Sequence, residues 1–334
     1  MTFNSTPIQD VSRDNWDAFC VQNKATLNHF YDFLEYSALS FGYLNKSFLI
    51  TLMKQPLAIV PLFIPISSEA ESPLLLAREP LPSPIFDQSL DVRKPDFLEF
   101  LISEIQSRIS LGVKEVMYKD SNWFELPDDL ALEILFSSDF ARIVSRKFNL
   151  ILNLDKSEEL LFKNLSRGHA RTIKGAVEQG QSVKVIDSRS AIEEIDAYFN
   201  NYQDSHKVAA GRLTRPQASF DYMKDLIGRD RAALFVNELA NRKVSFLYCD
   251  FYGDLARGWS QVNATNLEAG LYPRHLTEWK AILYFKSRGV RFYHIGSIDQ
   301  ELSSTITKKE LGIQDYKLRF HSAKIPELIF GLKC

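Results

Sequence analysis

The sequence predicts an α/β fold of the α+β type with two domains, and three observations support this. The chain has 334 residues, 45% of them hydrophobic, which is enough to fill two ordinary cores. Apolar runs at 48–53 and 57–64 flank Lys54-Gln55-Pro56 and predict an antiparallel hairpin. The order of elements predicted for the first half returns in the second, which indicates a duplication with a boundary near residue 150.

In the first half, apolar periodicity and turn residues define the elements. A proline-rich loop at 77–91 follows the hairpin and separates it from the next helix. We expect helices at 14–37 and 94–111, and further strands at 114–119 and 148–154.

In the second half, the same criteria predict four helices and five strands. The helices are expected at 157–180, 189–203, 216–227 and 273–288. The strands are expected at 232–238, 243–251, 257–264, 290–295 and 315–320.

Composition excludes several classes of function. The net charge of −2 gives no bulk attraction to nucleic acid, so any anion site must be local. The three scattered cysteines, Cys20, Cys249 and Cys334, fit a reducing cytoplasm. We expect no membrane span, because Lys54, Gln55 and prolines interrupt the most hydrophobic stretch. We also expect no metal, because the six histidines form no HxxxH or HExxH pair.

A run of cations without acids stands out between residues 162 and 177. Lys163, Arg167, Arg171 and Lys174 are spaced by four, four and three residues, so on one helix they share a face. Like charges at this spacing repel mildly unless something negative offsets them. The pattern fits either a solvated basic face or a binding site for an anionic ligand.

Two further clusters could hold an anion. A helix beginning at Pro273 would direct free N–H groups at the loop before it, where Tyr272, Arg274 and His275 flank its first turn. In a strand at 315–320, Lys317 and Arg319 would share one face and Tyr316 the other. Ordinary helix starts and lysine-protected strand edges would give the same patterns.

Four segments together resemble the FemAB-like branch of the GNAT acyltransferase superfamily. They are SRGHARTIKGAVEQG, SHKVAAGRLTRPQASFDYM, YPRHLTEWKAILYFKSRGVRFYHIG and GIQDYKLRF, which span roughly residues 150 to 321. The resemblance implies two GNAT-like domains, each a mixed, mostly antiparallel sheet flanked by helices. Residues 1–150 would be a divergent N-terminal GNAT-like domain and residues 151–334 the C-terminal acyltransferase domain.

The resemblance also implies roles for particular residues. Lys317 matches the lysine of the family's glycine, isoleucine, two-residue gap, phenylalanine, lysine pattern, with Tyr316 in place of phenylalanine. A fixed ammonium there could stabilise the oxyanion of acyl transfer. His206 and His275 are candidate bases by their titration class, and Asp299 is a further carboxylate. Each histidine could equally serve a structural hydrogen bond.

The resemblance leaves the donor open. Acyl-CoA is the expected co-substrate, with no cofactor bound, and the acceptor would be an amine of a nucleotide-linked sugar or a cell-envelope precursor. Aminoacyl-tRNA acting on a cell-wall precursor is an alternative, and a non-catalytic binding module is another. Two departures bear on this choice: residues 294–297 read HIGS where the family has aspartate, aliphatic, glycine, glycine, and NLEAGLYPRH holds only Gly270.

Overall fold

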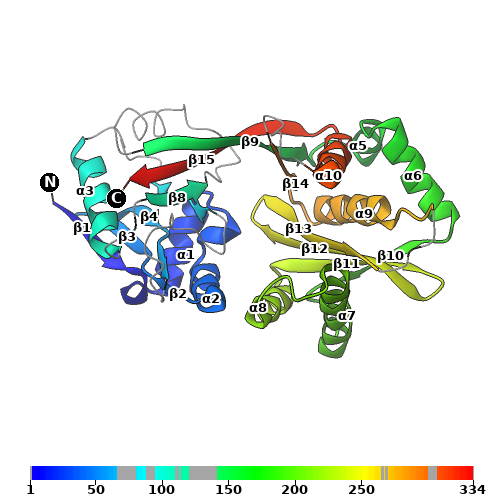
Figure 1. Ribbon diagram of the computed structural model, residues 1–334, viewed down its shortest axis with the longest axis horizontal. Helices are drawn as coiled ribbons and strands as arrows, with labels where there is room; N and C mark the ends of the chain where they lie inside the picture. The colour runs from blue at the N-terminus through cyan, green and yellow to red at the C-terminus, as the bar shows by residue number, and fades with distance from the viewer. Residues whose placement is uncertain are drawn as a thin grey trace. The chain divides into compact units, whose positions relative to one another are not determined.

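The computed structural model describes residues 2–65, 80–87, 95–109, 113, 115–119, 141–264, 267, 270–299 and 307–333. The chain divides into two compact units (Figure 1). The first unit contains Met1–Lys147 and Pro326–Cys334, and the second contains Phe148–Ile325. The predicted second domain, 151–334, therefore needs correction at its end, because the last nine residues belong to the first unit.

The first unit is built on the predicted hairpin, which the structure confirms. Strands β3 (Phe48–Leu52) and β4 (Gln55–Val60) pair antiparallel, and Met53 and Lys54 take φ values of 49° and 68° in the turn between them. Positive φ at both turn residues matches the twist of the flanking strands. The sheet order is β1 (Phe3–Pro7), β3, β4 and β7 (Ile85–Phe86), and a separate pair joins β2 (Tyr43–Asn45) to β5 (Phe63–Pro65).

The predicted helix at 14–37 is wrong as a single element. It is two helices, α1 (Arg13–Gln22) and α2 (Tyr31–Phe41), with Lys24 at φ 52° and a 3-10 turn at Leu27–His29 between them. The buried indole of Trp16 donates to the carbonyl oxygen of His29 at 2.8 Å and ties this break to α1. The other predicted helix of the first half, at 94–111, is observed as α3 (Pro95–Arg108).

The last strand of the chain completes the first unit. Strand β15 (Ala323–Lys333) pairs antiparallel with β8 (Glu115–Lys119), which pairs parallel with β6 (Leu81–Pro82). Gly331 lets the Glu115 side chain cross the strand, because a Cβ there would lie 1.9 Å from Glu115 Oε1. Arg142 of β9 (Ala141–Asn153) then binds both Glu115 carboxylate oxygens at 2.7 Å.

The second unit is a mixed, mostly antiparallel sheet, as predicted. Its order is β10 (Ser182–Ile186), β11 (Ala232–Leu239), β12 (Arg242–Tyr252), β13 (Leu255–Asn263) and β14 (Phe292–Asp299), with β9 next to β14. The first four strands pair antiparallel. Strands β13 and β14 pair in parallel only between Leu255–Arg257 and Phe292–His294, so they part beyond this point.

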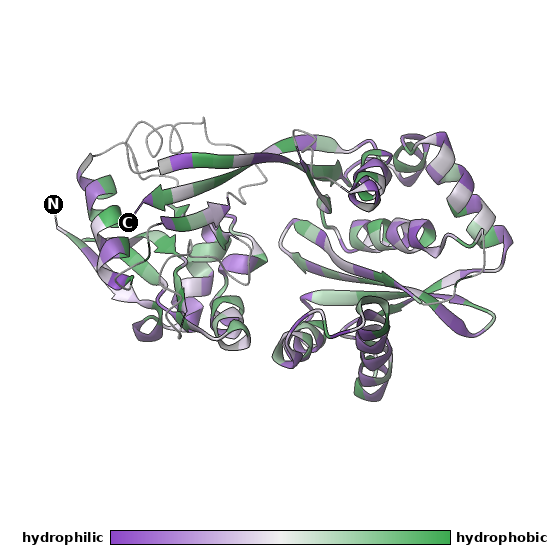
Figure 2. Ribbon diagram, in the orientation of Figure 1, coloured by the Kyte–Doolittle hydropathy of each residue, from purple (hydrophilic) through white to green (hydrophobic). Residues whose placement is uncertain are grey.

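Helices cover both faces of this sheet (Figure 1). On one face lie α7 (Ile192–Ala210) and α8 (Gln217–Gly228), where Tyr248 Oη donates to Met223 O at 2.8 Å. On the other lie α6 (Arg167–Glu178) and α9 (Pro273–Ser287). Hydrophilic and hydrophobic residues alternate along these helices (Figure 2). Buried residues of the sheet, α6 and α9 share one hydrophobic core.

Two predicted elements of the second unit are corrected. The helix at 157–180 is split into α5 (Glu158–Lys163) and α6, because the Ser166 side chain accepts from His169 N and begins a second helix. The predicted strand at 315–320 is wrong: these residues form the last turn of helix α10 (Lys308–Leu318) and the residues after it. Thr307 and Glu310 cap that helix reciprocally.

Candidate functional site

A pocket of about 760 Å³ opens beside α6 in the second unit. Its walls come from α6, from the turn between α6 and β10, and from the loop that precedes α9. Three of the four predicted cations, Arg167, Arg171 and Lys174, line it together with Tyr272. Glu178 is the acid in its wall. The structure therefore brings the cations of α6 and the mouth of α9 into one site.

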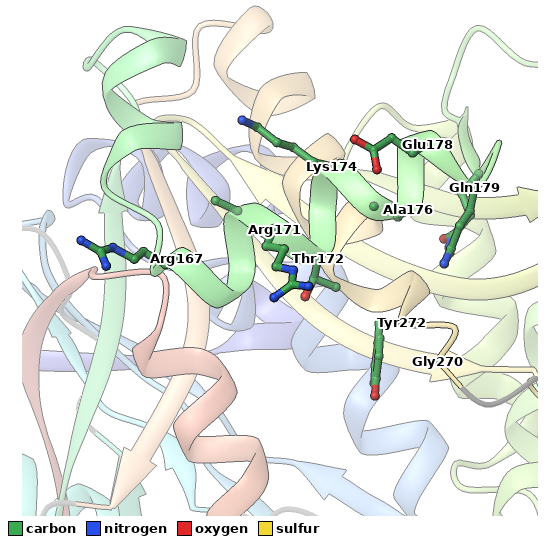
Figure 3. Close-up of a pocket in the computed structure, with 12 residues that line it drawn as sticks. Arg167, Arg171, Thr172, Lys174, Ala176, Glu178, Gln179, Gly270 and Tyr272 are labelled. Carbon is green, nitrogen blue, oxygen red and sulfur yellow. The ribbon is translucent and has the colours of Figure 1, made fainter.

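The side chains of these three cations do not converge on one point. Arg171 lies on the side of α6 nearer Tyr272, whereas Arg167 and Lys174 extend in other directions (Figure 3). Lys174 Nζ lies 5.7 Å from the ring centre of Phe162. Within the described part of the chain, none of the three has a carboxylate within 4 Å, so their charge is uncompensated there. Lys163 ends α5 and is not among the lining residues.

Next to the pocket, an aromatic cluster joins α6, α9 and α10. The rings of His169 and His275 lie 4.5 Å apart, and each is 5.0 Å from Tyr316. His169 Nε2 hydrogen bonds to Tyr316 O at 3.0 Å. Burial, with His169 and Arg274 nearby, lowers the pKa of His275 to about 4. Arg274 stacks on Tyr316 at 4.9 Å, so two more predicted residues, Arg274 and Tyr316, belong to this cluster.

Lys317 lies at the place where β13 and β14 part. From the last turn of α10, its Nζ donates to Ser297 O of β14 at 2.9 Å. A Cβ on Gly296 would approach Nζ to 2.7 Å, so the glycine leaves room for the ammonium group. The helix, rather than the predicted strand face, therefore positions this lysine against β14. Asp299 at the end of β14 accepts from Gln314 Nε2 of α10 at 3.0 Å.

A buried carboxylate at the same place was missed by sequence reasoning. Glu278 of α9 is 4% exposed, and Tyr293 Oη donates to its Oε1 at 2.6 Å. Burial raises the pKa of Glu278, while the Tyr293 hydrogen bond and the charges of Arg274 and Lys317 oppose that rise. One signal was available: Glu278 is an acid within the apolar stretch of a helix, next to Trp279.

His206 lies on the opposite face of the sheet from His275. Its Nε2 is 3.1 Å from Ser260 Oγ of β13, and Arg215 Nη1 donates to the same hydroxyl at 3.2 Å. Burial, followed by the charge of Arg215, lowers the pKa of His206 to about 4. The hydroxyl can donate to the neutral ring, so His206 and Ser260 form one hydrogen-bonded pair. The two predicted histidines thus belong to different parts of the second unit.

Two kinds of feature are absent from the described residues. There, no group of three or more histidine, cysteine, aspartate or glutamate side chains could hold a metal ion. Nor is any described helix both long and apolar enough to cross a bilayer.

Comparison with known proteins identifies the fold. No family model and no curated protein matches the sequence. Among solved structures, FemX superposes with a TM-score of 0.69 at 12% identity, covering 98% of this chain and 97% of FemX. L-PGS from Bacillus licheniformis gives 0.60 at 10%, with coverages of 96% and 91%. A tandem GNAT protein from the clavulanic acid biosynthesis pathway gives 0.57 at 9%, with coverages of 99% and 97%.

These likenesses concern the fold. They confirm the predicted GNAT-like fold, and the likeness in fold to FemX and to a tandem GNAT protein extends over nearly the whole chain. In the sequence, the motifs that carry the resemblance span roughly residues 150 to 321, and the first half was expected to be a divergent GNAT-like domain.

Proposed function

We propose that the protein is an acyltransferase that moves an acyl group from an activated, phosphate-bearing donor to an amine. The observation that carries this proposal is the parting of the parallel strands β13 and β14 beside the Lys317 ammonium. Peptide groups of strands that part lose their ladder partners and are available to a ligand. The fold relationship to FemX and to a tandem GNAT protein supports the same class of reaction.

In the proposed reaction the neutral amine attacks the donor carbonyl carbon and forms a C–N bond. The C–S bond of a thioester, or the C–O bond of an ester, breaks, and the leaving group departs with the bonding electron pair. Negative charge develops on the carbonyl oxygen during attack, and in this proposal the Lys317 ammonium stabilises it. The amine loses its extra proton to water or to a basic group of the substrate.

The pocket beside α6 supports a donor that carries phosphate. Arg167, Arg171 and Lys174 line it without carboxylate partners among the described residues, and guanidinium groups bind phosphate oxygens bidentately. The N–H groups at the start of α9, just after Tyr272, add partial positive charge. Uncompensated cations beside a helix N-terminus favour an anion over a solvated face.

Acyl-CoA is our proposed donor, and the acceptor class is an amine of a nucleotide-linked sugar or a cell-envelope or polysaccharide precursor. The tandem GNAT protein among the similar structures is described as "without AcCoA", which names such a donor for that protein. Aminoacyl-tRNA is the second candidate, favoured by the extent of the match to FemX. A cytoplasmic location belongs to the same proposal.

The test is turnover by the purified protein. Acetyl-CoA is offered with a panel of amino-sugar nucleotides, and free thiol is measured over time, with Lys317→Ala as the matched control. We expect thiol release that depends on both substrates. Release of amino acid from aminoacyl-tRNA, with no thiol release, would favour aminoacyl-tRNA as the donor. Absence of both reactions would favour a non-catalytic binding module.

A further inference from the structure

A hydrogen-bonded group on the α7 and α8 face of the second unit has no part in the transfer proposed above. It joins three elements: His206 belongs to α7, Arg215 directly precedes the N-cap residue of α8, and Ser260 belongs to β13. It shares no residue with the pocket beside α6 or with the Lys317 contact. A hydroxyl, an imidazole and a guanidinium from separate elements thus meet away from the site already described.

The hydrogen bonds assign a direction to the Ser260 hydroxyl. Arg215 Nη1 lies 3.2 Å from Ser260 Oγ, and a guanidinium group only donates. Because Oγ accepts from Arg215, its own hydrogen goes to His206 Nε2, which is 3.1 Å away. A ring nitrogen that accepts belongs to a neutral imidazole with its proton on Nδ1. The hydroxyl is therefore held between a base and a cation, the arrangement that activates a serine nucleophile.

Further contacts fix the base and leave the cation with donors to spare. The ring of Tyr202, one turn earlier in α7, meets the His206 ring edge-on, with 4.7 Å between the ring centres. Among the described residues, no carboxylate lies within 4 Å of Arg215. A guanidinium has five N–H donors, so those that do not bind Ser260 can stabilise an oxyanion formed beside it.

Ser260 also lies where β13 departs from regular pairing. Pairing with β14 ends at Arg257, and the register with β12 shifts between Gly258 and Ser260. Such bulges re-aim side chains and are common next to active sites. Ser260 is 8% exposed, and the flanking His206 and Arg215 are half-buried, so the group is open on their side.

We propose that Ser260 is a nucleophile activated by His206, and that it takes an acyl group from an activated ester or thioester. Ser260 Oγ attacks the carbonyl carbon and forms a C–O bond while its proton passes to His206 Nε2. N–H groups of Arg215 stabilise the charge on the carbonyl oxygen. The donor's C–O or C–S bond then breaks, and the leaving group takes the electron pair and the proton from His206. An acyl ester of Ser260 remains, formed without Lys317 and independently of the proposed function.

Diisopropyl fluorophosphate tests the serine without knowledge of its acyl donor, because it forms a stable ester with an activated hydroxyl and releases fluoride. The full-length protein is treated, and the modified peptide is identified by mass spectrometry. We expect modification at Ser260 in the wild type and none at this position in Ser260→Ala. His206→Gln can still hydrogen bond but is not a base, and we expect it to react about 100-fold more slowly.

Ser245→Ala is the matched control, because Ser245 is a fully buried serine of the neighbouring strand β12 whose hydroxyl has no hydrogen-bond partner among the described residues. Its labelling should equal that of the wild type. The urea midpoint of His206→Gln shows whether slower labelling comes from unfolding. An unmodified Ser260 in the wild type, or equal rates in the wild type and a folded His206→Gln, would overturn the proposal.

The pH dependence of labelling identifies the base without any substitution. A protonated ring cannot accept the Ser260 hydrogen, and burial, followed by the charge of Arg215, lowers the pKa of His206 to about 4. The rate at Ser260 should therefore hold from neutral pH to about pH 5 and fall only as pH approaches 4. A rate that already falls near pH 6.5, the ordinary pKa of histidine, would overturn the assignment of the base.

An activated ester tests the acyl step itself. After treatment with p-nitrophenyl acetate and acid quenching, we expect one acetyl group on the peptide that contains Ser260 and none there in Ser260→Ala. Acetyl groups on lysine side chains alone would overturn the acyl transfer to this serine.

Discussion

At the scale of single residues, the chemistry of the candidate site depends on polar groups placed next to glycines. Gly258 and Gly296 each leave the space that a polar group occupies, Tyr293 Oη in one case and Lys317 Nζ in the other. A Cβ at either position would be closer to these atoms than real contacts allow. The sequence shows such glycines but not what fills the space beside them.

Lys317→Ala is expected to lower turnover by about 100-fold or more while the protein stays folded, because one oxyanion donor is removed. The measurement is kcat under saturating donor, with circular dichroism and the urea midpoint as controls for the fold. Since Lys317 Nζ contacts Ser297 O, a modest loss of stability is compatible with the expectation. Unchanged turnover would remove the lysine from the mechanism.

His29 gives the first unit a stability that depends on pH. It is fully buried, with Nε2 3.0 Å from Ser83 O and Nδ1 3.0 Å from Thr26 Oγ1, and burial lowers its pKa from 6.5 to about 4. Between pH 6.5 and 4 the unfolded chain binds the proton and the folded one does not, so stability is lost as pH falls. The loss reaches about 3 kcal/mol at pH 4.

Urea denaturation of the wild-type protein and of His29→Gln at several pH values measures this effect. The variant is expected to lose the part of the pH dependence that His29 contributes, while the parts that come from His206 and His275 in the second unit remain. Substitution of the exposed His321 is the control and should leave the slope as it is. If the free energy of unfolding depends on pH in the same way in His29→Gln and in the wild type, His29 is not a source of the pH dependence.

At the scale of elements, sequence patterns found the main helices and strands but merged neighbouring helices, read the end of α10 as a strand and missed strands β10 and β15. The hairpin of β3 and β4 and the strands β11, β12 and β13 follow hydrophobic patterns that local spacing reveals. The cap of α6 at Ser166 interrupts a continuous cationic pattern, and the α10 capping box at Thr307 and Glu310 precedes a stretch that reads as a strand. In both places cap chemistry outweighed periodicity.

The site was predictable only where it follows from local spacing. Arg167, Arg171 and Lys174 are neighbours on α6, so three of the four predicted cations line one pocket. Tyr293 of β14 donates a hydrogen bond to Glu278 of α9 beside Gly258. Lys317 of α10 donates a hydrogen bond to a backbone oxygen of β14. Contacts between elements depend on register and packing, which no local pattern records.

Ser166→Ala is expected to lower the free energy of unfolding by about 1 kcal/mol, because His169 N loses the side-chain oxygen that caps α6. Urea denaturation measures the change. Thr172→Ala within the same helix is the matched control. The Thr172 hydroxyl donates to Gly168 O one turn earlier in the helix, and alanine is the better helix former. A larger loss for Thr172→Ala than for Ser166→Ala would contradict the capping argument.

At the scale of the whole molecule, shortening the chain tests which residues each unit needs in order to fold. The first unit needs residues 326–334, because β15 pairs with β8 through Ile329–Lys333 and closes over Glu115. We expect a chain that ends at residue 325 to retain a folded second unit and to expose the amides of β8. Peptide-level hydrogen exchange measures the protection of the second unit and of the β8 amides separately. Protection of β8 in the shortened chain would refute this role for β15.

The return of the last strand also bears on how the protein is made. Residues 148–325 must emerge from the ribosome before β15 exists, which takes roughly 10 to 40 s at bacterial and eukaryotic elongation rates. Throughout that interval β8 presents an unpaired edge, the kind of surface that chaperones shield and that neighbouring nascent chains can capture. The unit that is translated first is therefore the one that finishes folding last.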